Sequence, residues 1–271
     1  PVFVDFYEFT FNIDCEKLES AIQSTISEGK LNPKAIIPVD LFGVPARYRL
    51  IDDIAKKYDL KVIEDAAQSF GASTRNQKVG TFGDVAATSF YPAKPLGCYG
   101  DGGAIFTNNE EIAEKCKSIR FHGTTEKDRY HSEMIGLNGR LDSMQAAVLL
   151  EKLTIFDEEL DIRQNISNQY REHVNNCQYI PNNYTSSHAL FSILLQSNQE
   201  REEIINKLAK NNIPNVIYYK MPLHLMEAFS SLGYKEGNFL VWAELSERIL
   251  SLPMHPYLSD DDVGLIIDQI Q

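Results

Sequence analysis

Short apolar runs alternate with helix-like stripes along the first part of the 271-residue chain, and this alternation constrains the fold more than any other feature. Apolar residues four apart, such as Leu18, Ile22 and Ile26, indicate one face of a helix, whereas continuous apolar runs are typical of buried strands. Strands and helices that alternate with short connections form crossover units. We therefore predict an α/β fold with a mainly parallel central sheet covered on both faces. The strand-like runs are Val2–Val4, Ala35–Leu41, Leu60–Asp65, Val85–Tyr91 and Gly103–Thr107, and a second helical stripe covers Leu50–Tyr58.

The rest of the chain combines longer helical patterns with further strand-like runs. A helix over Asn108–Arg120 has an asparagine cap, acidic residues in its first turn and basic residues in its last, which complements the helix dipole. A helical pattern without proline or glycine runs from Leu141 to about Val174. A C-terminal α/β unit follows, with predicted strands at Leu190–Leu195 and Asn215–Tyr219 and predicted helices at Arg201–Lys210, Phe239–Leu250 and Asp260–Ile270.

Charge and composition exclude several classes of function. The net charge of −12 argues against a nucleic-acid or anionic-membrane partner, because either would need a basic face. A nucleotide-linked substrate is still allowed, since one phosphate needs only a few local donors. We expect no metal site and no membrane span, because neither the ligand spacing nor the long apolar run that they require occurs. The scattered cysteines fit a reducing cytoplasm; they are Cys15, Cys98, Cys116 and Cys177.

One lysine, Lys94, lies between a strand-like run and a glycine-rich turn, in the segment Thr88-Ser-Phe-Tyr-Pro-Ala-Lys-Pro-Leu-Gly-Cys-Tyr-Gly-Asp-Gly-Gly103. A lone loop lysine is usually a solvated surface residue, but these glycines allow the backbone to pack around a planar ring. Asp65 ends the earlier run Val62-Ile-Glu-Asp. An amine, a strand-end carboxylate and a nearby hydroxyl are the groups that pyridoxal phosphate chemistry needs. The glycines do not have dinucleotide-binding or P-loop spacing, and no Gly-x-Ser-x-Gly elbow occurs.

These two segments resemble the DegT/DnrJ/EryC1/StrS family of PLP-dependent nucleotide-sugar aminotransferases, as does a third block that begins Gly136-Leu-Asn-Gly-Arg-Leu-Asp. The resemblance covers essentially the whole chain. It implies the aspartate-aminotransferase-like fold type I and the cofactor pyridoxal 5'-phosphate (PLP). It further implies a large PLP-binding domain at residues 1–155 and a small C-terminal α/β domain at residues 156–271. Because the chain opens directly on a strand-like run, we expect that it lacks the family's N-terminal segment.

The resemblance implies roles for four residues around the cofactor. Lys94 would form the Schiff base and then carry the proton between substrate and cofactor, and Asp65 would keep the pyridine nitrogen protonated. Gln68 would lie against the ring, and the hydroxyl of Ser89 would donate to the phosphate. Glu64 is not selected, because alternation along the strand points it to the face opposite Asp65.

Two further blocks concern the substrate and the subunit contact. In the family the third block reaches across a dimer interface, so Asn138 would meet the neighbour's cofactor phosphate and Arg140 would bind the substrate anion. This implies a homodimer with shared active sites. Tyr218 and Tyr219 match a block that commonly reads His-Tyr-x-x-Pro-Leu-His, with tyrosine in place of the first histidine. A substrate-binding pair and two core tyrosines are equally compatible with that match.

By this resemblance the enzyme moves an amino group from glutamate to a nucleotide-linked keto sugar. The segments around Lys94 and Arg140 are most similar to enzymes that aminate C3 of a UDP-linked 2-acetamido-3-keto hexuronic acid for bacterial surface polysaccharide, such as lipopolysaccharide. The alternative substrate is a UDP- or dTDP-linked 4-keto-6-deoxy sugar, aminated at C4. A truncated, non-catalytic paralogue that binds nucleotide sugars is a hypothesis of another class, and retention of the four cofactor residues argues against it.

Overall fold

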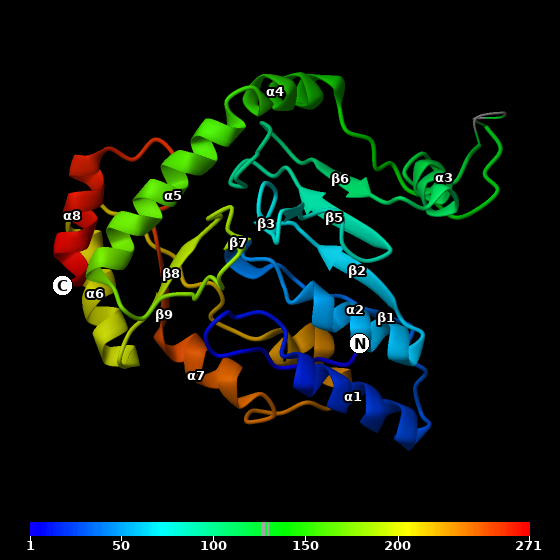
Figure 1. Ribbon diagram of the computed structural model, residues 1–271, viewed down its shortest axis with the longest axis horizontal. Coiled ribbons are helices and arrows are strands. Elements are labelled where there is room, and N and C mark those ends of the chain that lie inside the picture. The colour runs from blue at the N-terminus through cyan, green and yellow to red at the C-terminus, as the bar shows by residue number, and fades with distance from the viewer. Residues whose placement is uncertain (126–127, 129) are drawn as a thin grey trace.

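The core of the N-terminal half is a four-stranded sheet with the order β1-β2-β5-β6, seen in the computed structural model, which describes residues 1–125, 128 and 130–271 (Figure 1). β1 pairs with β2 and β2 with β5 in parallel, whereas β6 runs antiparallel to β5. The predicted α/β fold with a mainly parallel central sheet is confirmed. These strands are β1 (Ala35–Ile36), β2 (Lys61–Asp65), β5 (Val85–Ser89) and β6 (Gly103–Phe106).

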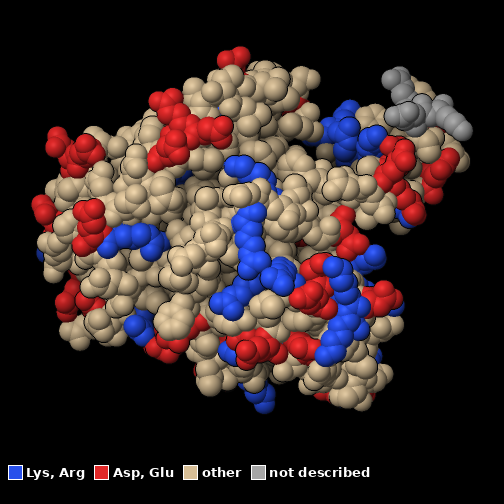
Figure 2. Space-filling model, viewed as in Figure 1, with Lys and Arg blue, Asp and Glu red and all other residues tan. Residues whose placement is uncertain are grey.

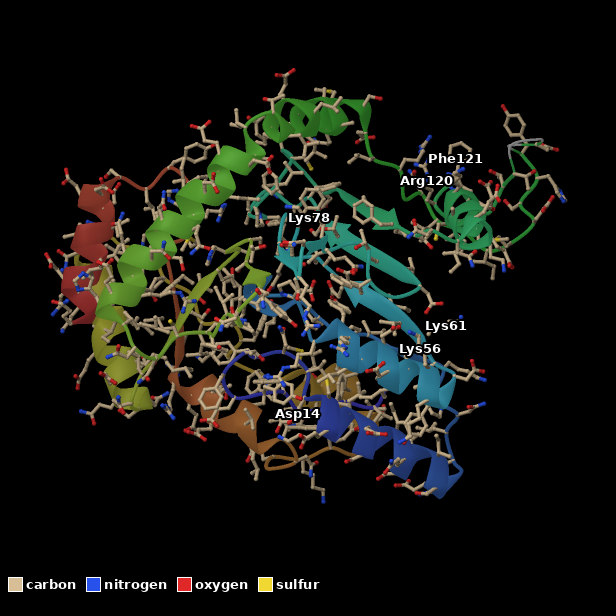
Figure 3. All side chains as sticks on the ribbon, in the orientation of Figure 1. Asp14, Lys56, Lys61, Lys78, Arg120 and Phe121 are labelled. Carbon is tan, nitrogen blue, oxygen red and sulfur yellow. The ribbon has the colours of Figure 1, made fainter. Side chains whose placement is uncertain are left out.

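Two amphipathic helices pack against one face of this sheet. Asp14, labelled in Figure 3, caps the N-terminus of α1 (Cys15–Glu28), because its carboxylate accepts hydrogen bonds from the amides of Glu16 and Lys17. Gly29 follows the helix in the left-handed conformation and caps its C-terminus. α2 (Tyr48–Tyr58) lies beside it. Burial of their apolar stripes against β1 and β2 stabilises this half of the molecule. The buried contacts include Leu18, Ile22, Ile36, Ile51, Ile54 and Val62.

The opposite face of the sheet is more open, so the prediction that both faces are covered is wrong for the described residues. Ile63 and Asp65 of β2 are half-buried on this face, and Ala87 of β5 and Ile105 of β6 are exposed. The register pairs Asp65 with Ala87 and Ala87 with Ile105, and Ser89 is two residues farther along β5. Because side chains alternate between the two faces of a sheet, Asp65 and Ser89 share the open face.

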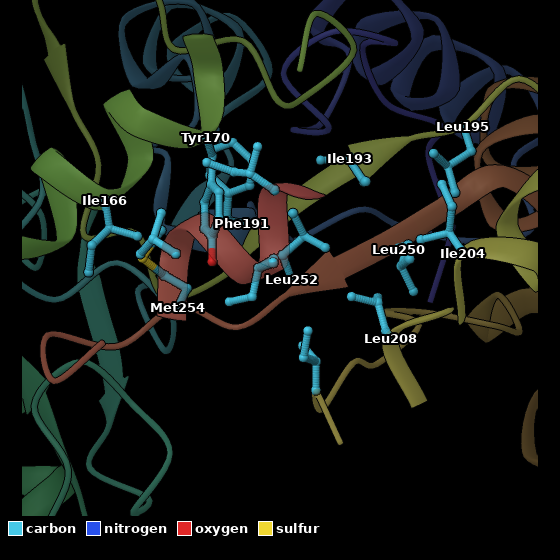
Figure 4. Close-up of a cluster of buried hydrophobic side chains, with 14 residues drawn as sticks. Ile166, Tyr170, Phe191, Ile193, Leu195, Ile204, Leu208, Leu250, Leu252 and Met254 are labelled. Carbon is cyan, nitrogen blue, oxygen red and sulfur yellow. The ribbon is translucent and has the colours of Figure 1, made fainter. Parts of the chain in front are cut away.

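A second core fills the C-terminal half, where three helices pack on an antiparallel pair of strands (Figure 4). The rings of Tyr170 and Phe191 pack in a tilted arrangement with centroids 4.9 Å apart, and Leu208 and Leu250 have no solvent exposure. Full burial of a leucine side chain contributes about 1.5–3 kcal/mol. The elements are α5 (Phe156–His173), α6 (Asn198–Lys210), α8 (Asp260–Ile270), β8 (Phe191–Leu194) and β9 (Ile249–Leu252).

Hydrogen bonds and a small sheet of order β4-β3-β7 join the two halves. The Gln178 side chain donates to the carbonyls of Thr10 and Leu41, and the Ser187 hydroxyl donates to the carbonyl of Gln68. The remaining elements are β3 (Ser73–Thr74), β4 (Gln77–Lys78), β7 (Tyr184–Thr185), α3 (Glu110–Ile119), α4 (Ser143–Leu153), α7 (Leu240–Arg248) and three 3-10 helices at Leu41–Gly43, Leu223–Leu225 and Glu227–Leu232.

Three predicted strands differ most from the structure. Val2–Val4 is irregular chain. The run from Ala35 forms a regular strand only to Ile36, because Pro38 has no amide hydrogen with which to continue the ladder. The run Asn215–Tyr219 forms no strand and touches β9 through a single bridge between Val216 and Ser251.

Two predicted helices also differ. The pattern from Leu141 to Val174 breaks into α4 and α5 at two adjacent β-branched residues, Thr154 and Ile155. The Thr154 hydroxyl donates to the Glu151 carbonyl and so helps to end α4. The predicted helix Phe239–Leu250 ends at Arg248, because the next residues enter β9. The division into domains at residues 155 and 156 coincides with the break before α5 and stays a prediction.

The surface view shows how the excess of acidic residues is distributed. On the face in Figure 2, acidic side chains occupy much of the margin and basic ones gather near the middle. In the part of the chain that the structure describes, no helix combines the length and apolar character needed to cross a membrane.

The carboxyl groups of Asp40 and Glu64 are fully buried in the N-terminal half. Glu64 has no solvent exposure and accepts hydrogen bonds from the amides of Gly80 and Phe82, at 2.7 and 2.9 Å. Burial raises the pKa of Glu64 to about 7, against the opposing effect of these bonds. Burial likewise raises the pKa of Asp40 to about 7, and the charge of Glu64 adds to that effect. Both groups therefore bind protons more tightly in the folded protein than in the unfolded chain.

We predict that the free energy of unfolding falls as the pH rises from about 4.5 to about 7, because over this range the folded state binds more protons than the unfolded state. Each such group contributes up to about 1.4 kcal/mol per pH unit. Glu64→Gln should remove part of the slope and leave the part due to Asp40. Urea unfolding at a series of pH values measures both slopes, and equal slopes in the two proteins would contradict the buried role of Glu64.

Candidate active site

Lys94 lies in a tight turn between β5 and β6. Its amide donates to the Tyr91 carbonyl at 2.8 Å. The turn requires glycine at Gly97, because a Cβ there would lie only 2.6 Å from the Pro92 carbonyl oxygen. The glycine-rich segment thus allows the close backbone packing around Lys94 that its sequence predicts.

Two side chains of α4 hold this turn in place, and the sequence analysis missed both. Lys152 donates to the Gly97 carbonyl at 2.7 Å, and its Nζ lies 5.2 Å from the centre of the Tyr99 ring. Gln145 accepts a hydrogen bond from the Tyr99 amide at 2.8 Å. Gln145 and Lys152 are seven residues apart, the spacing of one face of a helix, and this polar stripe is the sequence signal that could have found them.

Asp65 and Ser89 lie at the carboxyl ends of β2 and β5, on the open face of the sheet. An Asp65 carboxylate oxygen accepts from the Ala67 amide at 3.1 Å, and the Ser89 hydroxyl accepts from the Tyr91 amide at 3.2 Å. Both side chains are half-buried and keep further hydrogen-bonding capacity. The carboxyl ends of parallel strands are where α/β sheets bind ligands.

Gln68 connects this site to the C-terminal half. Its Oε1 accepts from the Phe42 amide at 2.6 Å, and its Nε2 donates to the Tyr219 hydroxyl at 3.0 Å. The predicted residues Gln68 and Tyr219 therefore meet, although they are far apart in sequence. Phe42 was not predicted, because a backbone donor leaves no signature in the sequence.

The charges in the site act on one another. Partial burial lowers the pKa of Lys94, and the charge of Asp65 opposes that effect. Within the described residues, Nζ of Lys94 has no hydrogen bond or ion pair. Burial raises the pKa of Tyr219, the hydrogen bond from Gln68 opposes the rise, and the charges of Tyr218 and Asp65 add to it. The phenol therefore stays protonated at neutral pH.

Asn138 and Arg140 lie apart from this group, on the segment between α3 and α4 that Figure 1 shows projecting from the body of the molecule. Both are exposed. The Arg140 Nε donates to the Asn138 side chain at 2.9 Å, and the guanidinium lies 5.2 Å from the centre of the Phe121 ring, labelled in Figure 3. The structure therefore joins this pair to Phe121 rather than to Lys94.

The two tyrosines of the C-terminal block have different surroundings. The ring of Tyr218 packs beside the apolar cluster of Phe11 and Phe42, and with Tyr219 and Trp242 it lines a small apolar pocket. The Tyr218 and Tyr219 rings meet edge to face, with centroids 5.3 Å apart. Only Tyr219 of this pair hydrogen bonds through its hydroxyl to another predicted site residue.

The donor set fits PLP. Lys94 supplies a half-buried amine without a partner in the described residues. Asp65 supplies a carboxylate on the open face of the sheet, and Ser89 supplies a hydroxyl at the end of the adjacent strand. No group of three or more His, Cys, Asp or Glu in residues 1–125, 128 and 130–271 is arranged to hold a metal ion.

The sequence profile of the DegT/DnrJ/EryC1/StrS aminotransferase family matches residues 1–271. The chain belongs to this family. It is 40% identical over 270 residues to the UDP-2-acetamido-2-deoxy-3-oxo-D-glucuronate aminotransferase of Pseudomonas aeruginosa, and the match covers 98% of this chain and 71% of that protein.

Two solved structures extend the comparison. A DegT DnrJ EryC1 StrS aminotransferase from Brucella abortus is 49% identical, with a TM-score of 0.94, and the match covers 100% of this chain and 72% of that chain. NtdA from Bacillus subtilis, solved with bound cofactor PMP, is 26% identical, with a TM-score of 0.87 and coverage of 100% and 61%. The protein is a PLP-dependent sugar aminotransferase of fold type I.

We predict that Asp65→Asn lowers the pKa of the Lys94 amine further, because the charge of Asp65 raises it. The pH dependence of amine modification, mapped to Lys94 by peptide mass spectrometry, measures this change. Glu64→Gln is the matched control, since Glu64 is adjacent in sequence but faces the other side of β2. The same Lys94 titration in wild type and Asp65→Asn would mean that the two side chains do not interact.

Proposed function

We propose that this enzyme transfers an amino group from glutamate to C3 of a UDP-linked 2-acetamido-3-keto hexuronic acid, for a bacterial surface polysaccharide such as lipopolysaccharide. The half-buried Lys94 amine beside the Asp65 carboxylate is the observation that carries the reaction type. The choice of sugar rests on the Pseudomonas aeruginosa relative, whose name specifies a 3-oxo-glucuronate. The free, scattered cysteines support a cytoplasmic enzyme.

Four residues of this chain would hold the cofactor. When bound, PLP withdraws electrons from the carbon that carries the amino group. Lys94 would hold it covalently, and the lowered pKa favours an unprotonated amine that accepts and returns a proton. Asp65 would keep a proton on the pyridine nitrogen, and Ser89 would donate to the phosphate. Gln68 would lie beside the ring, where its Oε1 is already held by a backbone amide.

Arg140 would bind an anionic group of the substrate. Its Nε is occupied by Asn138, but the described residues give Nη1 and Nη2 no hydrogen-bond partner, so two parallel donors remain for a carboxylate or phosphate. Its exposed position on a projecting segment supports a homodimer in which Asn138 and Arg140 complete the neighbour's site. Tyr219 would contact the sugar through its protonated hydroxyl, and Tyr218 would contact it beside the apolar pocket.

A comparison of two keto sugars tests the function. With glutamate as donor, we expect the UDP-linked 3-keto hexuronic acid to be aminated with a kcat/KM at least about tenfold above that of a UDP- or dTDP-linked 4-keto-6-deoxy sugar, since a bidentate contact to the carboxylate contributes about 1.5–3 kcal/mol. Product mass and 2-oxoglutarate release measure the reaction. Lys94→Ala should abolish it, together with the borohydride-trapped cofactor adduct. A preference for the 4-keto sugar would favour the C4 alternative, and binding without turnover would favour the non-catalytic paralogue.

Mixed dimers test the shared site. Lys94→Ala protein should be inactive and Arg140→Ala protein should retain about a tenth of wild-type activity or less. Above that residual activity their mixture should regain about a quarter of wild-type activity, since about half of the dimers are mixed and each has one complete site of two. Native mass spectrometry verifies the mixed dimers. An Arg140→Ala protein mixed with wild type controls for exchange. If verified mixed dimers stay inactive, Arg140 serves the Lys94 of its own chain.

A further inference from the structure

The Asp40 carboxylate lies behind the site and has no solvent exposure. One of its oxygens, Oδ1, accepts from the Ala46 amide and from the Tyr48 hydroxyl, both at 2.8 Å. The other, Oδ2, accepts from the Ser69 hydroxyl at 2.7 Å. Three donors thus converge on one buried carboxylate, and none of them belongs to the residues assigned to cofactor or substrate.

These bonds tie together two segments that both reach the site. Asp40 opens the turn 40–46, and Ser69 ends the segment 65–69, which carries Asp65 and Gln68. The backbone adds a second connection, because the Asp40 amide donates to the Asp65 carbonyl at 3.0 Å. Asp40 is therefore bonded to both ends of segment 65–69, by its backbone at one end and its side chain at the other.

The turn that Asp40 closes also orients Gln68. Phe42 adopts a left-handed conformation, with φ 61° and ψ 11°, which an L-residue with a large side chain rarely adopts. In this conformation its amide donates to Oε1 of Gln68, which leaves Nε2 as the donor beside Tyr219. The bond from Ala46 to Asp40 closes the turn around Phe42, so a strained backbone is held by surrounding contacts.

We propose that Asp40 is a positioning residue that fixes the amide orientation of Gln68 by holding turn 40–46 against segment 65–69. The inference rests on the proposed function, in which Gln68 lies beside the cofactor ring. A carboxylate suits this place because all three side-chain partners are donors. Asp40→Ala removes all three bonds, whereas an amide of the same shape would keep the two bonds to its oxygen and donate to the Ser69 hydroxyl, which accepts as well as donates.

Hydrogen exchange of the Gln68 side-chain amide, followed by NMR, tests this role directly. The resonance is assigned by its loss in Gln68→Glu. We expect Asp40→Ala and Ser69→Ala to increase that exchange about tenfold, because a freed amide rotates into solvent. Glu64→Gln is the matched control: it changes another buried carboxylate of the same half that does not bond segment 65–69, and it should leave the Gln68 amide unchanged.

If Asp40→Ala does not fold, Ser69→Ala still decides, since it removes the side-chain bond between Asp40 and segment 65–69 and leaves both bonds that close the turn. Ser69→Ala should also lower kcat about tenfold with little change in KM for glutamate, as expected for misplacement rather than lost binding. Unchanged Gln68 exchange in the folded variants, or equal changes in Glu64→Gln, would overturn the inference. The borohydride adduct on wild-type Lys94 tests the proposed function separately, and the amide exchange is interpretable whether or not that adduct forms.

Discussion

The parallel pairing of β2 with β5 is the constraint on which the site depends. It sets Asp65 opposite Ala87 and thereby places the Asp65 carboxylate on the same sheet face as Ser89. A shift of one residue in this register would move Asp65 to the covered face and bring Glu64 to the open one. Glu64 opposes such a shift, because its carboxylate is buried on the covered face and satisfied by two backbone amides. One buried acid thus helps to fix the register that exposes its neighbour.

The two strand ends become a site only because loops are held around them. The lysine turn after β5 is fixed from outside by Gln145 and Lys152 of α4. Segment 65–69 after β2 is fixed from behind by Asp40 and from the C-terminal half by the Ser187 hydroxyl, which donates to the Gln68 carbonyl. Catalytic geometry depends on such supporting contacts as much as on the reacting groups. The supporting residues come from three separate segments, which explains why the site requires both halves of the chain.

The sequence predicted the parts of this arrangement that local chemistry encodes. Strand–helix alternation was sufficient for the sheet, and the segments around Lys94 and Asp65 were sufficient to predict the cofactor PLP, whereas the residues that hold it stay a prediction. It failed where distant partners decide the structure. Residues 249–252 continue a helical apolar pattern but form β9, because β8 offers a partner strand. The bond between Gln68 and Tyr219, and the one between Asp40 and Ser69, join residues whose proximity exists only in the fold. A single sequence shows the acids and amides, but it does not show which of them meet.

Arg140 and Lys94 differ in burial and in the contacts that restrict their side chains. Lys94 is half-buried, and burial lowers the pKa of its amine. Arg140 is exposed and keeps its charge, but two contacts restrict it: the bond of Nε to Asn138 and the face of the Phe121 ring. Ordering a free arginine side chain on binding costs about 0.5–1.5 kcal/mol, and partial ordering beforehand reduces that cost. A guanidinium held in this way, on a segment that projects from the body, suits an anion that arrives from outside the chain's own core. In the proposed function, the proton-transfer group Lys94 is thus enclosed while the anion-binding group Arg140 reaches outward, as a site completed by a second subunit would require.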